Sequence, residues 1–395
     1  MKRVAFLLQG NQTGWLGGLS YLRNLLTAIC AYDDRRIEPV LLVHPTLKQG
    51  RLDGFPSIEV VRALWVARCH PARLASRAIY SLLERDLTLE LLLRKHRVDV
   101  LSHATVVGTR SLVTSIGWIP DFQHVRMPQY FGTEELKKRN RDFMRLIHGS
   151  HRIVLSSEDA RCDFAAFAPE AIDKTDVLRF VSCPDDLRSA LPKEQLYARF
   201  NIDRPYFHLP NQFWAHKNHA VVIEALGLLK QRGINLLVLA TGNTADYRDP
   251  LHFDRLMARA KELYVDKNFR VLGIVSRSEL QSLMLHSVAL INPSNFEGWS
   301  TTVEESKSLG LPIVLSDIPV HLEQSPPLGR YFKADDAEDL ADALVAAMLA
   351  HDPVLARQWR DEAVAALPER IRQYGRAYDH TVMAAIEKGN HYGSI

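Results

Sequence analysis

The sequence predicts an α/β protein made of two Rossmann-like domains, each with a mostly parallel sheet covered by helices. Short apolar runs alternate with longer amphipathic segments along nearly the whole chain. This alternation occurs in two successive series, which a turn-rich stretch at 182–204 separates. A length of 395 residues also exceeds what one ordinary core requires, which favours two domains.

In the first series, a strand is predicted at 2–8, followed by a Gly-containing turn at 10–18 and an amphipathic helix at 19–32. Further apolar runs predict strands at 39–43, 98–101, 112–119 and 152–155. In the second series, strands are predicted at 206–209, 235–240, 269–272, 289–292 and 313–316. Helices are predicted between them at 219–231, 253–264, 278–287 and 303–309.

These two series predict domains at 1–190 and 191–370. A last helix is predicted at about 361–388, and we expect its end, in residues 371–395, to pack back on the first domain. Ligands of such folds bind at the carboxyl ends of the parallel strands, so we expect a ligand cleft between the domains.

Composition and charge narrow the class of protein. No run approaches the roughly 20 apolar residues that cross a bilayer, and the apolar start of the chain fits a strand better than a signal peptide. Four scattered cysteines predict reduced thiols in a cytoplasmic protein. Residues 1–190 carry 27 Lys and Arg against 21 Asp and Glu, and the remainder carries 22 against 25. This basic half either faces an anionic membrane or acceptor or is simply solvated.

The sharpest functional pattern follows the strand predicted at 289–292. Glu297 lies in the next loop, and seven residues separate it from Glu305, which is predicted in the first turn of a helix. Free N–H groups and the helix dipole make such a helix start an anion site, and the two carboxylates suit sugar or ribose hydroxyls. Alternatively, Glu305 only caps the helix. The hydroxyls of Ser300, Thr301 and Thr302 are further hydrogen-bond donors, and Gly298, in the same loop as Glu297, is a further candidate binding residue.

Three other segments carry candidate residues. Lys217 follows the strand predicted at 206–209 and can neutralise a leaving diphosphate. Gly17 and Gly18 lie in a Gly-rich loop after the first strand and allow close backbone approach. Asp121 and His124 follow the strand predicted at 112–119, and either is a candidate active-site residue. Structural roles are expected for His103 and for the pair Ser156 and Ser157.

The segment 292–314 resembles the E-x7-E motif of family-4 retaining glycosyltransferases of the GT-B fold, followed by their G-x-P-[IV]-[IV] strand. The resemblance covers essentially the whole chain. It implies that Glu297 contacts the donor sugar hydroxyls and that Glu305 holds the nucleotide ribose. Residues 299–302, Trp-Ser-Thr-Thr, replace the small apolar residues usual there, which leaves the donor sugar open.

The same resemblance extends to the other segments. The stretch around Lys217 is similar to the family's R-x4-K-[GN] motif, with Gln212 at the Arg position. The pair Gly17 and Gly18 looks like the family's diphosphate-binding GG loop, and 118–128 resembles the segment that carries an active-site His or His-Asp. No cofactor or metal is expected, because the sequence has no Asp-x-Asp triplet and Lys217 with a helix start would replace Mg²⁺.

The resemblance implies transfer of a hexose, with mannose favoured, from a nucleoside diphosphate sugar to a glycan or lipid-linked glycan. Among donors a GDP-sugar is favoured over a UDP-sugar, and no nucleic-acid partner is expected. The protein would be cytoplasmic, with peripheral contact at the inner face of the membrane. Alternatives are a nucleotide-sugar epimerase, a phosphorylase or a non-catalytic nucleotide-sugar-binding protein. An NAD-dependent dehydrogenase is disfavoured, since the G-x-G-x-x-G fingerprint is missing.

Overall fold

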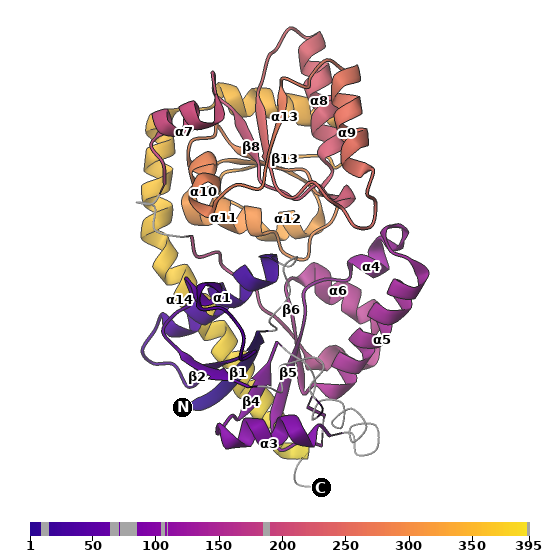
Figure 1. Ribbon diagram of the computed structural model, residues 1–395, viewed down its shortest axis with the longest axis vertical. Coiled ribbons are helices and arrows are strands. Elements are labelled where there is room, and N and C mark those ends of the chain that lie inside the picture. Colours follow the sequence, from indigo (N-terminus) through magenta and orange to yellow (C-terminus); the bar gives the residue numbers. More distant parts are fainter. Residues whose placement is uncertain are drawn as a thin grey trace. The chain divides into compact units, whose positions relative to one another are not determined.

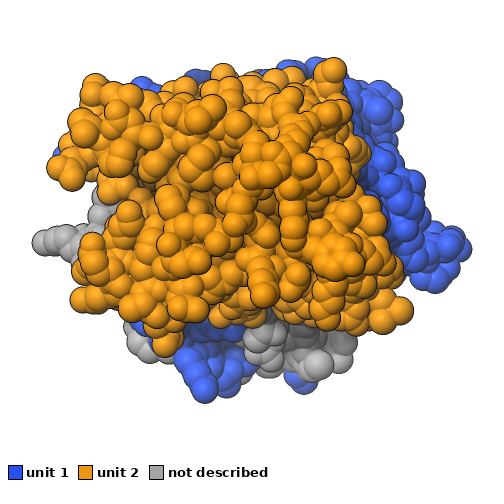
Figure 2. Space-filling model, turned by 90° about the horizontal axis from the view of Figure 1, so that it is seen from above, with its two compact units in different colours: residues 1–181, 368–395 blue, residues 182–367 orange. Residues whose placement is uncertain are grey.

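The computed structural model describes residues 1–8, 16–63, 71, 85–103, 107–108, 110–184 and 190–392. It divides the chain into two compact units, coloured separately in Figure 2. Unit 1 comprises Met1–Val181 and Pro368–Ile395, and unit 2 comprises Ser182–Leu367. The chain thus passes into unit 2 at residue 182, nine residues before the boundary expected at 191, and it returns to unit 1 at Pro368.

Unit 1 contains a seven-stranded, wholly parallel sheet with the order β3-β2-β1-β4-β5-β6-β7. Its strands are β1 (Lys2–Leu8), β2 (Ile37–Val43), β3 (Glu59–Arg62), β4 (Val100–Ser102), β5 (Thr114–Ile119), β6 (Arg152–Leu155) and β7 (Thr175–Val177). Its α-helices, which Figure 1 labels, are α1 (Leu16–Cys30), α3 (Leu87–Lys95), α4 (Gln123–Arg126), α5 (Thr133–Gly149) and α6 (Glu158–Phe167). Its 3₁₀ helices are η1 (Gln49–Leu52), η3 (Pro128–Tyr130) and η4 (Pro169–Lys174).

Unit 2 contains a six-stranded parallel sheet with the order β10-β9-β8-β11-β12-β13. Its strands are β8 (Phe207–Leu209), β9 (Val238–Thr241), β10 (Phe269–Gly273), β11 (Leu290–Asn292), β12 (Ile313–Ser316) and β13 (Gly329–Phe332). Its helices are α7 (Lys193–Phe200), η6 (Ala215–Lys217), α8 (His219–Gln231), α9 (His252–Glu262), α10 (Arg277–Leu285), α11 (Thr301–Leu309), α12 (Pro319–Gln324) and α13 (Ala337–Leu349); α14 (Pro353–Tyr392) begins here and ends in unit 1.

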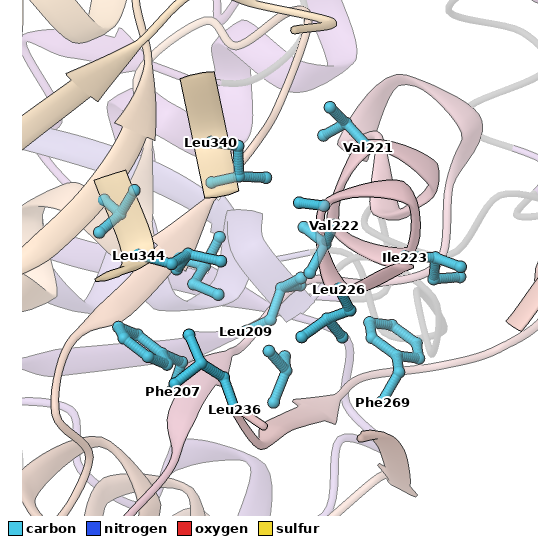
Figure 3. Packing of buried hydrophobic residues seen from close by; sticks show 14 of the residues in the cluster. Phe207, Leu209, Val221, Val222, Ile223, Leu226, Leu236, Phe269, Leu340 and Leu344 are labelled. Carbon is cyan, nitrogen blue, oxygen red and sulfur yellow. The ribbon is translucent and has the colours of Figure 1, made fainter. Parts of the chain in front are cut away.

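The core of unit 2 follows from the two-residue period of its strands. Alternate side chains of β8 and β9 point to opposite faces, so Leu209 packs with α8 and α13 while Leu239 packs in a separate cluster on the other face. Figure 3 shows Val222 and Leu226 of α8 and Leu340 of α13 gathered around Leu209. Each such side chain contributes about 1.5–3 kcal/mol on burial. This packing fixes β8 against α8, and with them the loop that joins the two.

Several expected elements differ from the observed ones. Helix α1 begins at Leu16, so Gly17 and Gly18 lie in its first turn and not in the preceding loop. The pattern gave no signal for α5, because this helix buries only Ile147 and Gly149 and its other face is highly charged. Helix α14 begins eight residues before the expected start at 361, although Pro368 lies inside it.

Helix α14 is tied to unit 1 through a buried carboxylate. Asp379, 3 % exposed, accepts hydrogen bonds from the Arg36 backbone N–H at 2.7 Å and from Arg36 Nε at 2.8 Å. The Tyr32 hydroxyl donates to the same carboxylate at 3.2 Å and to the carbonyl oxygen of Gly375 at 3.1 Å. These contacts hold the end of the chain against α1 and β2.

Within the described residues, no helix is both long and apolar enough to cross a membrane.

Asp379→Ala is expected to lower the free energy of unfolding of unit 1 by about 2–3 kcal/mol, because three donors lose their charged acceptor. Urea unfolding followed by circular dichroism measures this loss. The control is Asp34→Ala, which removes an exposed ion pair with Arg376 at 3.5 Å on the same helix and should cost less than about 0.5 kcal/mol. Equal losses in the two variants would contradict the anchoring role of Asp379.

Candidate functional site

The candidate site of unit 2 lies where the strand order of its sheet reverses. The chain runs outward from β8 to β9 and β10 on one side and from β11 to β12 and β13 on the other. In such sheets ligands bind at the carboxyl ends of the two strands at this topological switch point. The loop after β8 carries Lys217 and the loop after β11 carries Glu297, so both sequence-predicted residues lie at this edge.

Lys217 and Glu297 form a direct ion pair, with Nζ 2.5 Å from Oε1. Their side chains are 15 % and 10 % exposed, so the pair is largely withdrawn from solvent. Ser294 Oγ donates to the same carboxylate oxygen at 2.8 Å. Among the described residues, no hydrogen bond to Glu297 Oε2 is found. One carboxylate oxygen is therefore held by Lys217 and Ser294, whereas the other has no hydrogen-bond partner within the described residues.

Glu297 is ionised at physiological pH. Burial alone would raise the pKa of its carboxyl, but the Lys217 ammonium and the hydrogen bonds from Lys217 and Ser294 outweigh it and lower the pKa. An ionised carboxylate accepts hydrogen bonds and donates none, so Glu297 suits the binding of hydroxyls and not the donation of a proton.

The Lys217 loop is held by an amide and carboxylate cluster. After the 3₁₀ turn η6, Asn218 adopts a left-handed backbone with φ of 52°, which Asn tolerates better than most residues. Its Nδ2 donates to Asn295 Oδ1 at 3.0 Å and to Asp335 Oδ1 at 2.7 Å. The backbone N–H of Asn295 in turn donates to the His216 carbonyl at 2.8 Å. The loops that carry Lys217 and Glu297 are thereby fixed to each other.

Beneath the ion pair, Asn292 at the end of β11 is fully buried and uses its whole amide. Its Oδ1 accepts from Asn211 Nδ2 at 3.1 Å and from Ser294 Oγ at 2.8 Å. Its Nδ2 donates to Ser300 Oγ at 2.6 Å and lies 3.3 Å from His321 Nε2. Ser294 has one hydroxyl hydrogen, which Asn292 Oδ1 shares with Glu297 Oε1, and through these contacts Asn292 joins four segments.

His321, also fully buried, has a defined tautomer. Its Nδ1 lies 2.9 Å from the Ser316 carbonyl oxygen, which can only accept, so Nδ1 carries the hydrogen and Nε2 accepts from Asn292. Burial lowers the pKa of His321 to about 4 despite the opposing charge of Glu297. The ring is thus neutral at physiological pH, as its hydrogen bond with Asn292 requires.

The start of α11 differs in detail from the expectation. Ser300 is the N-cap and accepts from the Val303 N–H, so Glu305 does not cap the helix and lies in its second turn. The first-turn carboxylate is Glu304, which is 1 % exposed and pairs with Lys307 at 3.0 Å. The sequence did not predict a role for Glu304, because no local pattern in a sequence shows that a carboxylate is buried.

The predicted donor residues differ in exposure. Ser300 is 1 % exposed and Thr302 is 5 % exposed, and Thr302 Oγ1 donates to Asn211 Oδ1 at 3.3 Å. Their hydroxyls thus serve the scaffold of the site. The predicted donor-site residues that keep partial exposure are Gln212, Gly298, Thr301 and Glu305.

In unit 1, Asp121 and His124 follow β5 but differ in surroundings. Asp121 is partly exposed and accepts from the Gln123 N–H at 2.9 Å. His124 is 2 % exposed, with Nε2 3.0 Å from Asn140 Oδ1 and its ring edge-on to Phe143 at 4.8 Å. Burial lowers the pKa of His124. Ser157, for which a structural role was expected, caps α6 by accepting from the Ala160 N–H at 3.0 Å.

The strand order of unit 1 reverses between β1 and β4, one strand away from Asp121. The first residue after β4 is His103, for which a structural role was expected. The residues directly after β1, which include most of the predicted Gly-rich loop, lie outside the described residues; Gly17 is exposed and Gly18 buried in α1. No sequence pattern marks His103, because its position depends on how β4 pairs with β1.

Comparisons with known proteins agree with this architecture. Residues 194–365 match the family model described as "Glycosyl transferases group 1". No curated protein matches the sequence. Among solved structures, a glycosyltransferase from Rickettsia africae has a TM-score of 0.67 at 14% identity, covering 98% of both chains.

Two further structures align over nearly the full length. Alr3699/HepE of Anabaena, in complex with UDP and glucose, has a TM-score of 0.66 at 14% identity and covers 97% of this chain and 100% of its own. WaaG, a glycosyltransferase of lipopolysaccharide biosynthesis, has a TM-score of 0.57 at 17% identity, covering 97% and 98%. The chain therefore has the two-domain GT-B fold, and the part of it that matches the group 1 glycosyltransferases, residues 194–365, lies in unit 2.

The neutral state of His321 predicts a loss of stability in acid. The folded-state pKa of about 4 lies below the ordinary value of 6.5, so between these values the unfolded chain binds the proton and the folded chain does not. Stability should therefore fall as pH drops from 6.5 towards 4, at up to about 1.4 kcal/mol per pH unit for this group. In urea unfolding at several pH values, His321→Gln should show a shallower decline, whereas the exposed His148→Gln should match the parent protein. Identical slopes for all three proteins would refute the assignment.

Proposed function

We propose that this protein is a retaining glycosyltransferase that moves a hexose from a nucleoside diphosphate sugar to a glycan or lipid-linked glycan. The observation that carries the proposal is the largely solvent-shielded Lys217–Glu297 pair at the switch point of unit 2, next to the start of α11. This pair lies inside the segment that matches the group 1 glycosyltransferases. A cation for a leaving phosphate and a carboxylate for sugar hydroxyls are the two groups that sugar transfer from such a donor requires.

In the proposed reaction, the bond between the sugar C1 and the β-phosphate oxygen breaks, and the acceptor hydroxyl oxygen bonds to C1 from the same face. The acceptor proton passes to the departing phosphate, so no side chain of the protein has to act as a base. Lys217 stabilises the negative charge that grows on the phosphate, and this contribution is larger in the transition state than in the ground state. The reaction is proposed to need no metal ion.

For the donor, we favour a GDP-hexose such as GDP-mannose, in line with the mannosyltransferase-like motifs. A UDP-hexose is the second candidate, because the HepE structure that resembles this chain was determined with UDP and with UDP-glucose. Among the donor-site residues, Glu305 is proposed to hold the ribose and Glu297 the transferred sugar. Polysaccharide or lipopolysaccharide synthesis is the proposed setting, which the likeness to WaaG supports.

Peripheral membrane contact is proposed for unit 1. Three cationic residues recur at intervals of three and four along the solvent-exposed side of α5, and they are Lys138, Arg141 and Arg145. This spacing places them on one face of the helix. A cationic stripe of this kind suits an anionic membrane surface, where a lipid-linked acceptor would be found.

Glu305→Ala is expected to weaken nucleoside diphosphate binding by roughly 1.5–3 kcal/mol, since the ribose loses a charged hydrogen-bond acceptor. Glu297→Ala should leave nucleotide binding nearly intact and lower turnover, because its proposed partner is the sugar. Calorimetry with GDP and with UDP measures both affinities and also separates the two candidate donors. Equal loss of nucleotide affinity in both variants would contradict this division of roles.

Lys217→Ala is expected to lower kcat by about 10²–10³, whereas Lys217→Arg should retain partial activity because it keeps the charge.

Assays are run with EDTA present, where turnover of the parent enzyme should persist if the reaction needs no metal ion. Proton NMR of the product from an α-linked donor should show an α-linkage. A β-linked product would rule out the retaining mechanism, whatever the mutants did.

A further inference from the structure

The switch point of unit 1 carries a histidine in an unusual conformation. His103 follows β4 directly and has a backbone φ of 54°, in the left-handed region that non-glycine residues rarely adopt. In unit 2 the corresponding switch-point loops carry Lys217 and Glu297. Because strained residues cluster at functional sites, His103 and its surroundings are candidates for a role in ligand binding by unit 1.

A chain of hydrogen bonds connects His103 to the C-terminal helix. Tyr378 of α14 donates its hydroxyl hydrogen to Ser102 Oγ at 2.6 Å, and both residues are fully buried. Ser102 Oγ lies 2.8 Å from His103 Nδ1, and His103 Nε2 lies 2.8 Å from the Tyr21 hydroxyl. Both ring nitrogens of His103 thus have protein partners.

The direction of this chain follows from the donor at its start. Since Ser102 Oγ accepts from Tyr378, its own hydrogen has to go to another acceptor, and within the described residues the other hydrogen-bond contact of Ser102 Oγ is with His103 Nδ1. Leaving that hydrogen without an acceptor in a fully buried site would cost the desolvation of the hydroxyl. His103 Nδ1 therefore accepts, and the hydrogen of the neutral ring lies on Nε2 and points to the Tyr21 oxygen.

Burial keeps this arrangement intact over the physiological range, because it lowers the pKa of His103 to about 3. The next residue in the chain, Tyr21 of α1, stacks on Trp118 of β5 with ring centroids 4.3 Å apart and an interplanar angle of 9°. The centroid of the His103 ring lies 5.5 Å from that of the Trp118 ring and 5.8 Å from that of the Tyr378 ring. The hydrogen-bonded chain and the stacked rings together lie at the carboxyl ends of β4 and β5.

We propose that Tyr378 and Ser102 are positioning residues, which fix the Nε2–H tautomer of His103 and thereby hold the Tyr21–Trp118 stack in the geometry that receives the acceptor. The inference rests on the proposed glycosyltransferase function and deepens it, since it assigns acceptor binding to unit 1. Under this proposal helix α14 contributes more than packing, because the Tyr378 hydroxyl helps to fix the His103 ring at the switch point of unit 1.

The tautomer is tested by ¹⁵N-histidine NMR of the full chain, with His103→Gln to assign the signals of His103. Long-range ¹H–¹⁵N correlations should show Nε2–H and an unprotonated Nδ1 from pH 6 to 8. Tyr378→Phe should shift the Nδ1 signal of His103, because the Ser102 hydroxyl loses the Tyr378 hydrogen bond that polarises it and then donates more weakly to Nδ1. An Nδ1–H tautomer in the parent protein, or unchanged nitrogen shifts in Tyr378→Phe, would overturn the proposal.

A matched control separates positioning from stability. Tyr32→Phe also removes a buried hydroxyl that binds α14, through Gly375 and Asp379, but it lies outside the chain to His103. With GDP-mannose as donor and octyl α-mannoside as acceptor probe, Tyr378→Phe should raise the acceptor KM five- to tenfold and leave GDP affinity unchanged. Tyr32→Phe should lower Tm by a similar amount and leave the acceptor KM unchanged.

Equal kinetic effects of the two variants would show that Tyr378 only stabilises the fold, and the proposal would fail. If the parent protein transfers no sugar from GDP-mannose or UDP-glucose, that result counts against the proposed function instead. The NMR experiment needs no turnover, so it then decides alone whether Tyr378 and Ser102 position the His103 ring.

Discussion

The candidate site of unit 2 depends on one buried amide, that of Asn292. At the end of β11 its four hydrogen bonds join the loop after β8, the loop that carries Glu297, the cap of α11 and the His321 ring. A buried amide costs free energy unless every donor and acceptor is paired. The same pairing that removes this cost therefore also sets the relative positions of the segments that carry Lys217 and Glu297.

Charge balance follows from that scaffold. Lys217 and Glu297 neutralise each other in a poorly hydrated site, where an uncompensated charge would be costly. A donor diphosphate would compete with Glu297 for the same ammonium group. Under the proposed function, the ion pair would hold Lys217 in place before a donor binds, which is the preorganisation that lowers the cost of reorganisation during a reaction.

Helix α14 belongs to both units, and its two parts pack on different units. Its first part packs on unit 2, where the Trp359 carbonyl lies so close to Gly310 that a Cβ there would approach within 2.2 Å. From Pro368 onward it packs on unit 1 through Asp379 and Tyr378. Since proline lacks the N–H of an intrahelical hydrogen bond, the change of unit coincides with a weakened point of the helix.

The sequence by itself determined the alternation of strands and helices and the two loops that carry Lys217 and Glu297, because hydrophobic period and the ends of apolar runs are local signals. It did not predict α5, whose charged surface hides its helical period, or the start of α1 at Leu16. Only the tertiary structure decided the roles of Asn292, Glu304 and His103. The partners of Asn292 and His103 are distant in sequence, 81 residues for Asn211 with Asn292 and 82 for Tyr21 with His103, and such contacts exist only once the parallel strands have paired. Glu304 pairs with Lys307, only three residues away, and it is the burial of Glu304 that the sequence did not show.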